Sequence, residues 1–242
     1  TKAFGQSSIV EIRPGAGATM AAGHAARSEP DGYTIHMGTS GNLAVAPNLY
    51  RNLTYDALKD FDFAALVGRS PLVLVVRSGS SIKSFADLIE SSKSTSLNYG
   101  SGGNGVVNHL AMELVKKSSG AKLTHVPYKG SAPALNDLLG GAIDVMFDTS
   151  TVTLPLIQSG KLRAIAVSTS SRIELLPEVP TFAESGLPTP PNMDGWWAIT
   201  APAGTPDEIL DRLNKELVKI LETESVKAKL LLDREQRMIM VQ

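Results

Sequence analysis

Short apolar segments alternate with longer amphipathic segments along this chain, and this alternation limits the possible folds more than any other feature. Gly, Pro or Ser bounds each apolar segment, as is typical of buried strands. The predicted strands cover residues 9–12, 33–37, 64–67, 72–76, 97–99, 124–126, 143–147 and 162–167. Because helix-length segments separate many of them, the sequence predicts an α/β fold with parallel sheets. A chain of 242 residues is long enough for two lobes, each with its own core.

Start signals locate several of the helices. Thr205 is a predicted N-cap, because Pro206 follows at the first helical position and Glu208 can complete a capping box. A shorter helix is expected to begin after Ser84. Ser131 is the predicted cap of a further helix, which runs directly into the next predicted strand.

The segment at residues 99–109, YGSGGNGVVNH, contains the spacing G-x-G-x-x-G at Gly100, Gly102 and Gly105. It follows a predicted strand and precedes a helix with an apolar stripe, which Gly120 terminates. The start of such a helix has unpaired backbone N–H groups and the positive end of the helix dipole. The segment is therefore suited to binding an anion.

Two other interpretations of this segment have to be weighed. A dinucleotide site needs an acidic residue at the end of the following strand, yet residues 125–129 read HVPYK and contain none. The segment also lacks the Lys-Ser/Thr ending of a P-loop. Nucleotide binding is therefore disfavoured. The alternative interpretation, that the glycines are needed only for the conformation of the turn and bind nothing, stays open.

A second polar loop follows the predicted strand at 33–37. It consists of Gly38, Thr39, Ser40, Gly41 and Asn42. Small hydroxyl side chains and backbone N–H groups at the carboxyl end of a strand can bind a carboxylate without a bulky cation, and in open α/β sheets ligands bind at such strand ends. An ordinary capped turn is the alternative interpretation.

Catalytic and metal-binding motifs are weak in this sequence. The second loop misses G-x-S-x-G by one position, and nothing identifies a His and Asp partner for Ser40. The histidines lack ligand spacing such as H-E-x-x-H, so no metal site is predicted. His109 can touch a ligand or lie on the helix surface, and Asp148 can cap a helix or contact a ligand. An α/β hydrolase or nucleotide-dependent enzyme acting on a small anion stays an alternative, because polar strand-end loops also build active sites.

Composition excludes several other classes of function. With 23 basic and 24 acidic residues the net charge is -1, which predicts no general attraction to nucleic acid or anionic membranes. The apolar runs are shorter than a membrane span, and the sequence contains no cysteine for disulfides or thiolate sites. No cofactor is expected, and any anion site has to be local.

Longer motifs indicate a family. They are RPGAGATMAAGHAARSEPDGYTIHMGTSGNLAVAPNLY (13–50), LNYGSGGNG (97–105), HVPYKGSAPALNDLLGGAIDVMFD (125–148), SGKLRAIAVSTSSR (159–172), LPEVPTFAESGLP (176–188) and APAGTPDEILDRLNKEL (201–217). In this order they closely resemble the solute receptors of tripartite tricarboxylate transporters, also called the Bug family. The resemblance extends from about residue 5 to about residue 230.

This resemblance implies a type II periplasmic binding protein, with two α/β lobes joined by two crossing strands that close over a small organic acid. Lobe 1 is expected at residues 1–75 and 198–242, and lobe 2 at residues 76–197. Such a receptor performs no chemistry, is a periplasmic monomer, and delivers its ligand to membrane permease subunits. A receptor that serves a sensor kinase is the alternative partner assignment.

The resemblance also implies a set of ligand-binding residues, since members of the family bind carboxylates through loop amides, hydroxyls and water. From the first lobe these are Thr39, Ser40 and Asn42, and from the second Ser101, Gly102, Gly103 and Asn104, with His109, Tyr128 and Asp148 as further contacts.

The ends of the chain depart from the family pattern. Compared with the family pattern, the sequence as given begins after the first strand, Pro-Gly-Gly-rich loop and helix, and we expect that a signal peptide has been removed. The segment LLLDREQRMIMVQ also stops short of the usual closing elements. We therefore expect either part of a longer protein or a trimmed mature form whose first lobe is incomplete.

Overall fold

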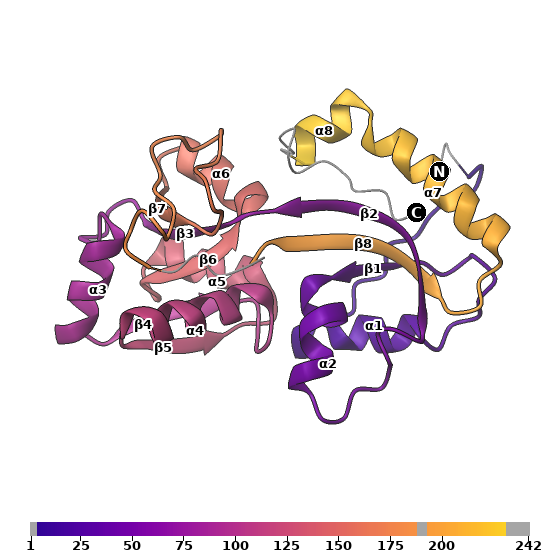
Figure 1. Ribbon diagram of the computed structural model, residues 1–242, viewed down its shortest axis with the longest axis horizontal. Coiled ribbons are helices and arrows are strands. Elements are labelled where there is room, and N and C mark those ends of the chain that lie inside the picture. Colours follow the sequence, from indigo (N-terminus) through magenta and orange to yellow (C-terminus); the bar gives the residue numbers. More distant parts are fainter. Residues whose placement is uncertain (1–3, 188–192, 231–242) are drawn as a thin grey trace. The chain divides into compact units, whose positions relative to one another are not determined.

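The computed structural model describes residues 4–187 and 193–230, which divide into two compact units (Figure 1). The first unit contains residues 4–68 and 196–230, and the second contains residues 69–187 and 193–195. The chain passes between the units within strands β2 (Phe61–Ser70) and β8 (Gly195–Pro202). The lobe boundaries expected from the sequence stay a prediction, and the parts of them at residues 1–3, 188–192 and 231–242 lie outside the described residues.

The second unit is built on a five-stranded mixed sheet with the order β5-β4-β6-β3-β7. The strands are β3 (Leu72–Arg77), β4 (Leu97–Ser101), β5 (Leu123–Pro127), β6 (Val145–Thr149) and β7 (Leu162–Val167). Strand β4 is parallel to β5 and β6, whereas β3 is antiparallel to β6 and β7. The prediction of parallel sheets was therefore wrong for β3. Because β3 follows β2 directly, without a crossover helix, it starts beside the carboxyl end of β6, where Leu72 is paired with Thr149.

Helices cover both faces of this sheet (Figure 1). They are α3 (Phe85–Ser94), α4 (Val107–Ser119), α5 (Ser131–Gly140) and α6 (Ser150–Gln158). Tyr99 of β4 is fully buried in one core cluster with Met112 of α4. The next residue, Gly100, points to the other face, where an added Cβ would lie 3.3 Å from Cβ of Ala134 in α5. Helices α4 and α5 therefore pack on opposite faces.

The first unit contains a three-stranded sheet with the order β1-β8-β2, in which β1 (His36–Thr39) is antiparallel to β8. Helix α7 (Asp207–Leu221) packs its Leu213 against one face. Helix α1 (Thr19–Ala25) packs with Phe61 on the other face. The remaining elements are the 3-10 helix η1 (Ala16–Ala18), the π-helix η2 (Ser40–Val45), and the α-helices α2 (Ala46–Leu49) and α8 (Glu224–Leu230).

The structure corrects several predictions about local structure. Residues 9–12 form no strand: Ile9 is 93 % exposed, and none of the described strands pairs with this segment. A strand requires a neighbour to satisfy its backbone, which an apolar run alone cannot supply. The strand expected at 33–37 begins at His36. The N-cap assigned to Thr205 was also wrong, because α7 begins after Pro206 and the Thr205 hydroxyl donates to the Pro202 carbonyl instead.

Ser131 is the first helical residue of α5 and not its cap, a position that Gly130 occupies with a φ of 108°. Helices α1 and α6 were not predicted from the sequence patterns. Across the described part of the chain, every helix is too short or too polar to cross a membrane.

Candidate functional site

Three helices begin at the same edge of the second unit's sheet. Strands β4, β5 and β6 are parallel, so their carboxyl ends lie side by side, and each is followed directly by a helix. Helices α4, α5 and α6 therefore all start at this edge, which we call the carboxyl edge. Helix starts carry unpaired N–H groups and a partial positive charge. The carboxyl edge thus favours an anion although the chain has almost no net charge.

The glycine loop, residues 101–105, joins β4 to α4 at the centre of this edge. The Ser101 side chain is fully buried, and its Oγ lies 3.2 Å from the Gly103 N, which donates to it, and 2.6 Å from His125 Nε2. The other end of the loop is anchored by Gly105, whose N–H donates to His109 Nδ1 at 3.1 Å. Gly105 has a φ of 79°, which favours glycine. Both ends of the loop are therefore hydrogen-bonded to side chains, those of Ser101 and His109.

The glycine loop lies directly against the start of α5. The Gly130 N–H donates to the Gly102 carbonyl at 3.1 Å, and a Cβ added at Gly102 would lie 3.3 Å from the Ser131 nitrogen. A side chain at position 102 would therefore crowd the first amides of α5. Tyr128 joins the same region, since its N–H donates to the Ser101 carbonyl. Its hydroxyl donates to Asp137 Oδ2 at 2.6 Å, and this hydrogen bond raises the pKa of Tyr128 to about 12.

Asp148 is a buried carboxylic acid near the end of β6. It is 4 % exposed, and Oδ1 accepts from the Thr149 N–H at 2.8 Å. Oδ2 has no hydrogen-bond partner of ordinary geometry within the described residues. Burial raises the pKa of Asp148 to about 6, although the Thr149 amide and an interaction with the Ser131 hydroxyl oppose this rise. Asp148 can therefore accept from a bound donor, or donate when it is protonated.

A second unpartnered acceptor lies at the start of α4. Asn108 is buried and its Nδ2 donates to the Phe147 carbonyl at 3.2 Å, while its Oδ1 has no partner in the part of the chain that the structure describes. Buried polar atoms without partners are rare in proteins and need an explanation. Asn108 thus adds a second polar group at the carboxyl edge to which a bound molecule could donate.

An aromatic stack lies beside the glycine loop, because two of its rings, those of His109 and His125, are within hydrogen-bond distance of loop residues. The rings of His109 and His125 are stacked with centroids 4.1 Å apart, and His125 stacks on Tyr99 at 4.7 Å. Burial lowers the pKa of His125 to about 4 and also lowers the pKa of His109. Both imidazoles are therefore neutral near pH 7.

The polar loop of the first unit is mostly occupied by its own hydrogen bonds. Thr39 and Asn42 form a capping box around the start of η2, in which the Thr39 N–H donates to Asn42 Oδ1 at 2.8 Å. Asn42 Nδ2 also lies within hydrogen-bond distance of the Ala18 carbonyl and of His36 Nε2. Ser40 differs, because its hydroxyl makes no hydrogen bond to any described residue. Ser40 is therefore the side chain of this loop that is available to a ligand.

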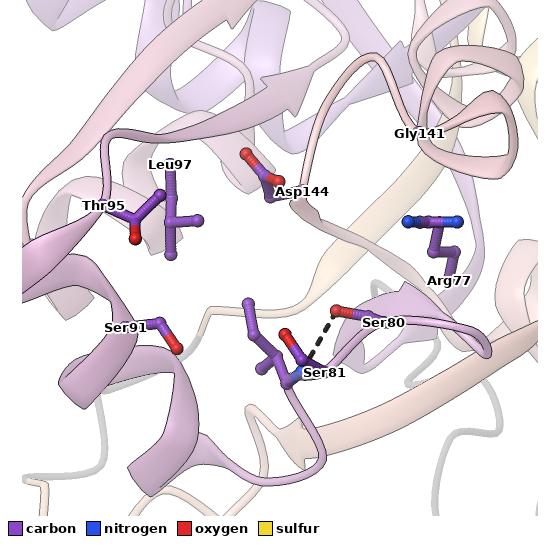
Figure 2. Close-up of a pocket in the computed structure, with 9 residues that line it drawn as sticks. Arg77, Ser80, Ser81, Ser91, Thr95, Leu97, Gly141 and Asp144 are labelled. Atoms are coloured by element: carbon purple, nitrogen blue, oxygen red, sulfur yellow. Dashed lines mark hydrogen bonds between the residues drawn. The ribbon is translucent and has the colours of Figure 1, made fainter.

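A pocket of about 240 Å³ in the second unit lies at the other end of β4 (Figure 2). Its lining includes Leu97, the first residue of β4, together with Arg77 and Asp144, whereas the glycine loop follows the last residue of that strand. The pocket contains none of the predicted ligand-binding residues. No cluster of metal-ligating side chains occurs among residues 4–187 and 193–230.

Comparison with known sequences decides the family. Residues 1–237 match the family model described as the tripartite tricarboxylate transporter family receptor. The chain belongs to this receptor family.

Individual relatives agree with this assignment. The chain is 38 % identical over 224 residues to the UPF0065 protein in the TAR-I ttuE-ttuC' intergenic region of Agrobacterium vitis, with 92 % of this chain and 64 % of that protein covered. It therefore spans less than two thirds of the length of this curated relative. Among solved structures it resembles R. palustris Rpa4515 with adipate at 36 % identity and a TM-score of 0.88, covering 94 % of this chain and 77 % of the other.

A third relative is MatC from Rhodopseudomonas palustris with bound malate, at 33 % identity and a TM-score of 0.84. The match covers 90 % of this chain and 74 % of MatC. The chain also resembles the structure of periplasmic binding protein BugD at 33 % identity and a TM-score of 0.87, covering 95 % of this chain and 77 % of BugD. This similarity confirms the expected fold class, that of a periplasmic binding protein.

The structure gathers many of the predicted site residues of this receptor at one place. The second-unit set lies at the carboxyl edge and comprises Ser101, Gly102, Gly103, Asn104, His109, Tyr128 and Asp148. The set from the first unit, Thr39, Ser40 and Asn42, forms a separate loop. Asn108, whose Oδ1 has no partner among the described residues, was not among the predicted site residues, and neither was His125. A polar residue in the first turn after the glycine loop was the available signal for Asn108.

Proposed function

We propose that this chain is an extracytoplasmic solute receptor that binds a small organic carboxylate and delivers it to a tripartite tricarboxylate-type membrane transporter. The observation that carries the proposal is the convergence of three helix starts and the glycine loop at the carboxyl edge of one sheet. The proposed site residues include no Lys or Arg, so backbone amides and hydroxyls would bind the anion. Two related structures support this ligand class, since one was solved with adipate and the other with bound malate.

The proposed residues divide into two roles. The amides around Gly102 and Gly103, the Ser40 hydroxyl and the Asp148 carboxyl group are proposed to contact the ligand. Ser101 and the Thr39–Asn42 pair are proposed to shape the two loops, because their hydrogen bonds are made within those loops.

One contact favours an enzyme as the second candidate. Ser101 Oγ lies 2.6 Å from His125 Nε2, as in a Ser-His pair of a hydrolase. However, the Ser101 side chain is 0 % exposed and its Oγ already accepts from the Gly103 N–H. No described carboxylate forms a hydrogen bond to His125. Ser101 therefore cannot reach a substrate carbonyl in this arrangement, and the receptor is favoured.

Calorimetric titration of the full mature protein with a panel of carboxylates tests the proposal. Malate, adipate, monocarboxylates and amino acids are titrated at pH 7.5, and the recovered ligand is analysed by NMR. Saturable binding of an unchanged carboxylate is expected. Conversion of any compound would instead support the enzyme, and a panel without any binding would contradict the proposed ligand class.

A matched pair of variants tests the location of the site. Gly102→Ala places a Cβ against the first amide of α5, whereas Gly140→Ala adds a Cβ that meets no atom within 4 Å. We expect Gly102→Ala to abolish binding and Gly140→Ala to preserve it. Equal affinities for the two variants would place the site elsewhere.

The partner is tested separately. The receptor is added to membrane vesicles that contain the two membrane subunits of a tripartite tricarboxylate-type transporter, and uptake of the bound carboxylate is measured. Uptake that depends on the receptor is expected. Binding without stimulated uptake would favour the sensor kinase as the partner.

A further inference from the structure

We propose that His109 is a positioning residue which holds the glycine loop in its anion-binding shape as a hydrogen-bond acceptor, so that protonation of His109 weakens carboxylate binding. This inference rests on the proposed function for its second part, the effect on binding. The first part concerns the loop alone and can be tested without a ligand.

The hydrogen bond from the Gly105 N–H fixes the protonation state of His109. Because Nδ1 accepts this bond at 3.1 Å, it carries no proton, and the ring proton of the neutral imidazole is on Nε2. Gly105 is the last residue of the glycine loop, and His109 lies four residues later in the first turn of α4. The helix therefore anchors the loop through one imidazole nitrogen.

A second imidazole supports the other end of the loop. His125 Nε2 lies 2.6 Å from Ser101 Oγ, which also accepts from the Gly103 N–H and lies 3.0 Å from the Gly103 carbonyl. All three contacts are satisfied when His125 Nε2 donates to Ser101 and the Ser101 hydroxyl donates to Gly103. Protonation of His125 would leave this set intact, whereas protonation of His109 would remove the acceptor that Gly105 needs. His109 is thus the sensitive member of the stacked pair.

The charged and titratable groups around the pair come from three elements. Glu113 and Lys116 lie on α4 itself, Tyr99 on β4 and His125 on β5. Glu113 Oε1 accepts from both Lys116 Nζ, at 2.7 Å, and the Tyr99 hydroxyl. Its charge is therefore already paired, and burial keeps both imidazoles neutral at pH 7.

A positioning role and a contact role for His109 predict opposite effects of pH. If His109 touched the carboxylate directly, its protonation would strengthen binding, because the imidazolium would attract the anion. If His109 holds the loop, protonation releases the Gly105 N–H and weakens binding. The sign of the change below pH 6.5 therefore separates the two roles.

Amide exchange of Gly105 in the 242-residue chain, measured by NMR, tests the loop. The variants are His109→Leu, which removes the acceptor, and His109→Asn, whose side-chain oxygen can replace Nδ1. We expect exchange about fivefold faster in His109→Leu, the effect of one lost neutral hydrogen bond, and near wild-type exchange in His109→Asn. Lowering the pH should reduce the protection of the Gly105 amide against exchange in the wild type and not in His109→Asn. Exchange at Gly105 that is equal in all three proteins would overturn the proposal.

The effect on binding is measured by titration with malate and with adipate at pH 7.5 and pH 5.5. Protonation of the ligand and of Asp148 changes the affinity of the wild type and of His109→Asn alike, so these effects cancel in the ratio of the two affinities. This ratio is expected to fall at pH 5.5, and a rise would overturn the positioning role. Failure of every carboxylate to bind would refute the proposed function, whereas the Gly105 exchange would still decide whether His109 positions the loop.

Discussion

Replacement of Asp148 by Asn should stabilise the protein at neutral pH. The pKa of Asp148 is about 6 instead of 3.8, and at about 1.4 kcal/mol per pH unit the ionised side chain destabilises the fold by about 3 kcal/mol at pH 7. The folded state binds more protons than the unfolded state between these two values, so this destabilisation develops as the pH rises from about 4 to 6.

The expected gain is smaller than this maximum. The Asn side chain can still accept from the Thr149 N–H, but its amide group places a new donor where Oδ2 has no partner. A buried donor without a partner costs about 1–3 kcal/mol. We therefore expect Asp148→Asn to be about 1 kcal/mol more stable than the wild type at pH 7, and to lose this advantage near pH 4.

Urea unfolding followed by far-ultraviolet circular dichroism is the suitable assay, because both tryptophans, Trp196 and Trp197, lie in the first unit and Asp148 in the second. The difference between variant and wild type is compared at pH 4 and pH 7. Taking this difference removes the contribution of His125, which is the same in both proteins. Because the pKa of His125 is about 4 in the folded protein and 6.5 in the unfolded chain, protonation of the unfolded chain lowers stability as the pH falls below 6.5. Asp211→Asn, an exposed substitution on α7, is the control. A variant that is less stable at pH 7, or a difference independent of pH, would refute the reasoning.

Three further predictions concern side chains of the two loops and the sheet. Ser101→Ala should destabilise the second unit by about 1–3 kcal/mol, because it leaves the Gly103 N–H without its acceptor, and urea unfolding measures this loss. Ser40→Ala removes a hydroxyl that makes no hydrogen bond to the described residues, so it should change the free energy of unfolding by less than about 1 kcal/mol but weaken carboxylate binding in calorimetry; unchanged binding would remove Ser40 from the site. Gly100→Ala should cost about 1–3 kcal/mol in thermal unfolding, since its Cβ would overlap Ile143 Cδ1; a neutral effect would show that the Ile143 side chain can move aside.

The glycine loop could be predicted from the sequence because its chemistry is local. Gly105 requires a positive φ, and a strand, a glycine turn and an apolar stripe follow one another within one segment. Spacing alone therefore located the helix start. The failed strand at 9–12 and the antiparallel β3 depended on pairing with distant segments, which a local pattern does not encode.

The roles of the polar side chains were harder to predict. Thr39 and Asn42 belong to residue types that bind ligands, but the same groups can bond to their own backbone, and here they form a capping box. Ser101 and His109 were also expected to contact the ligand, whereas the structure directs their hydrogen bonds to the glycine loop. The sequence patterns located two polar loops, but they could not show that hydrogen bonds within those loops occupy several of the side chains proposed to bind a ligand.

If the glycine loop binds the carboxylate as proposed, its main-chain character has a consequence for the evolution of such receptors. Peptide N–H groups are present whatever the side chain, so these contacts are lost only through substitutions that crowd or move the backbone, such as Gly102→Ala. Substitutions at neighbouring positions such as Asp148, Asn108 and Tyr128 can then alter the shape and polarity of the site while the carboxylate contacts persist. Duplicated copies of such a gene can therefore acquire new ligands by single substitutions, without passing through a form that binds no carboxylate.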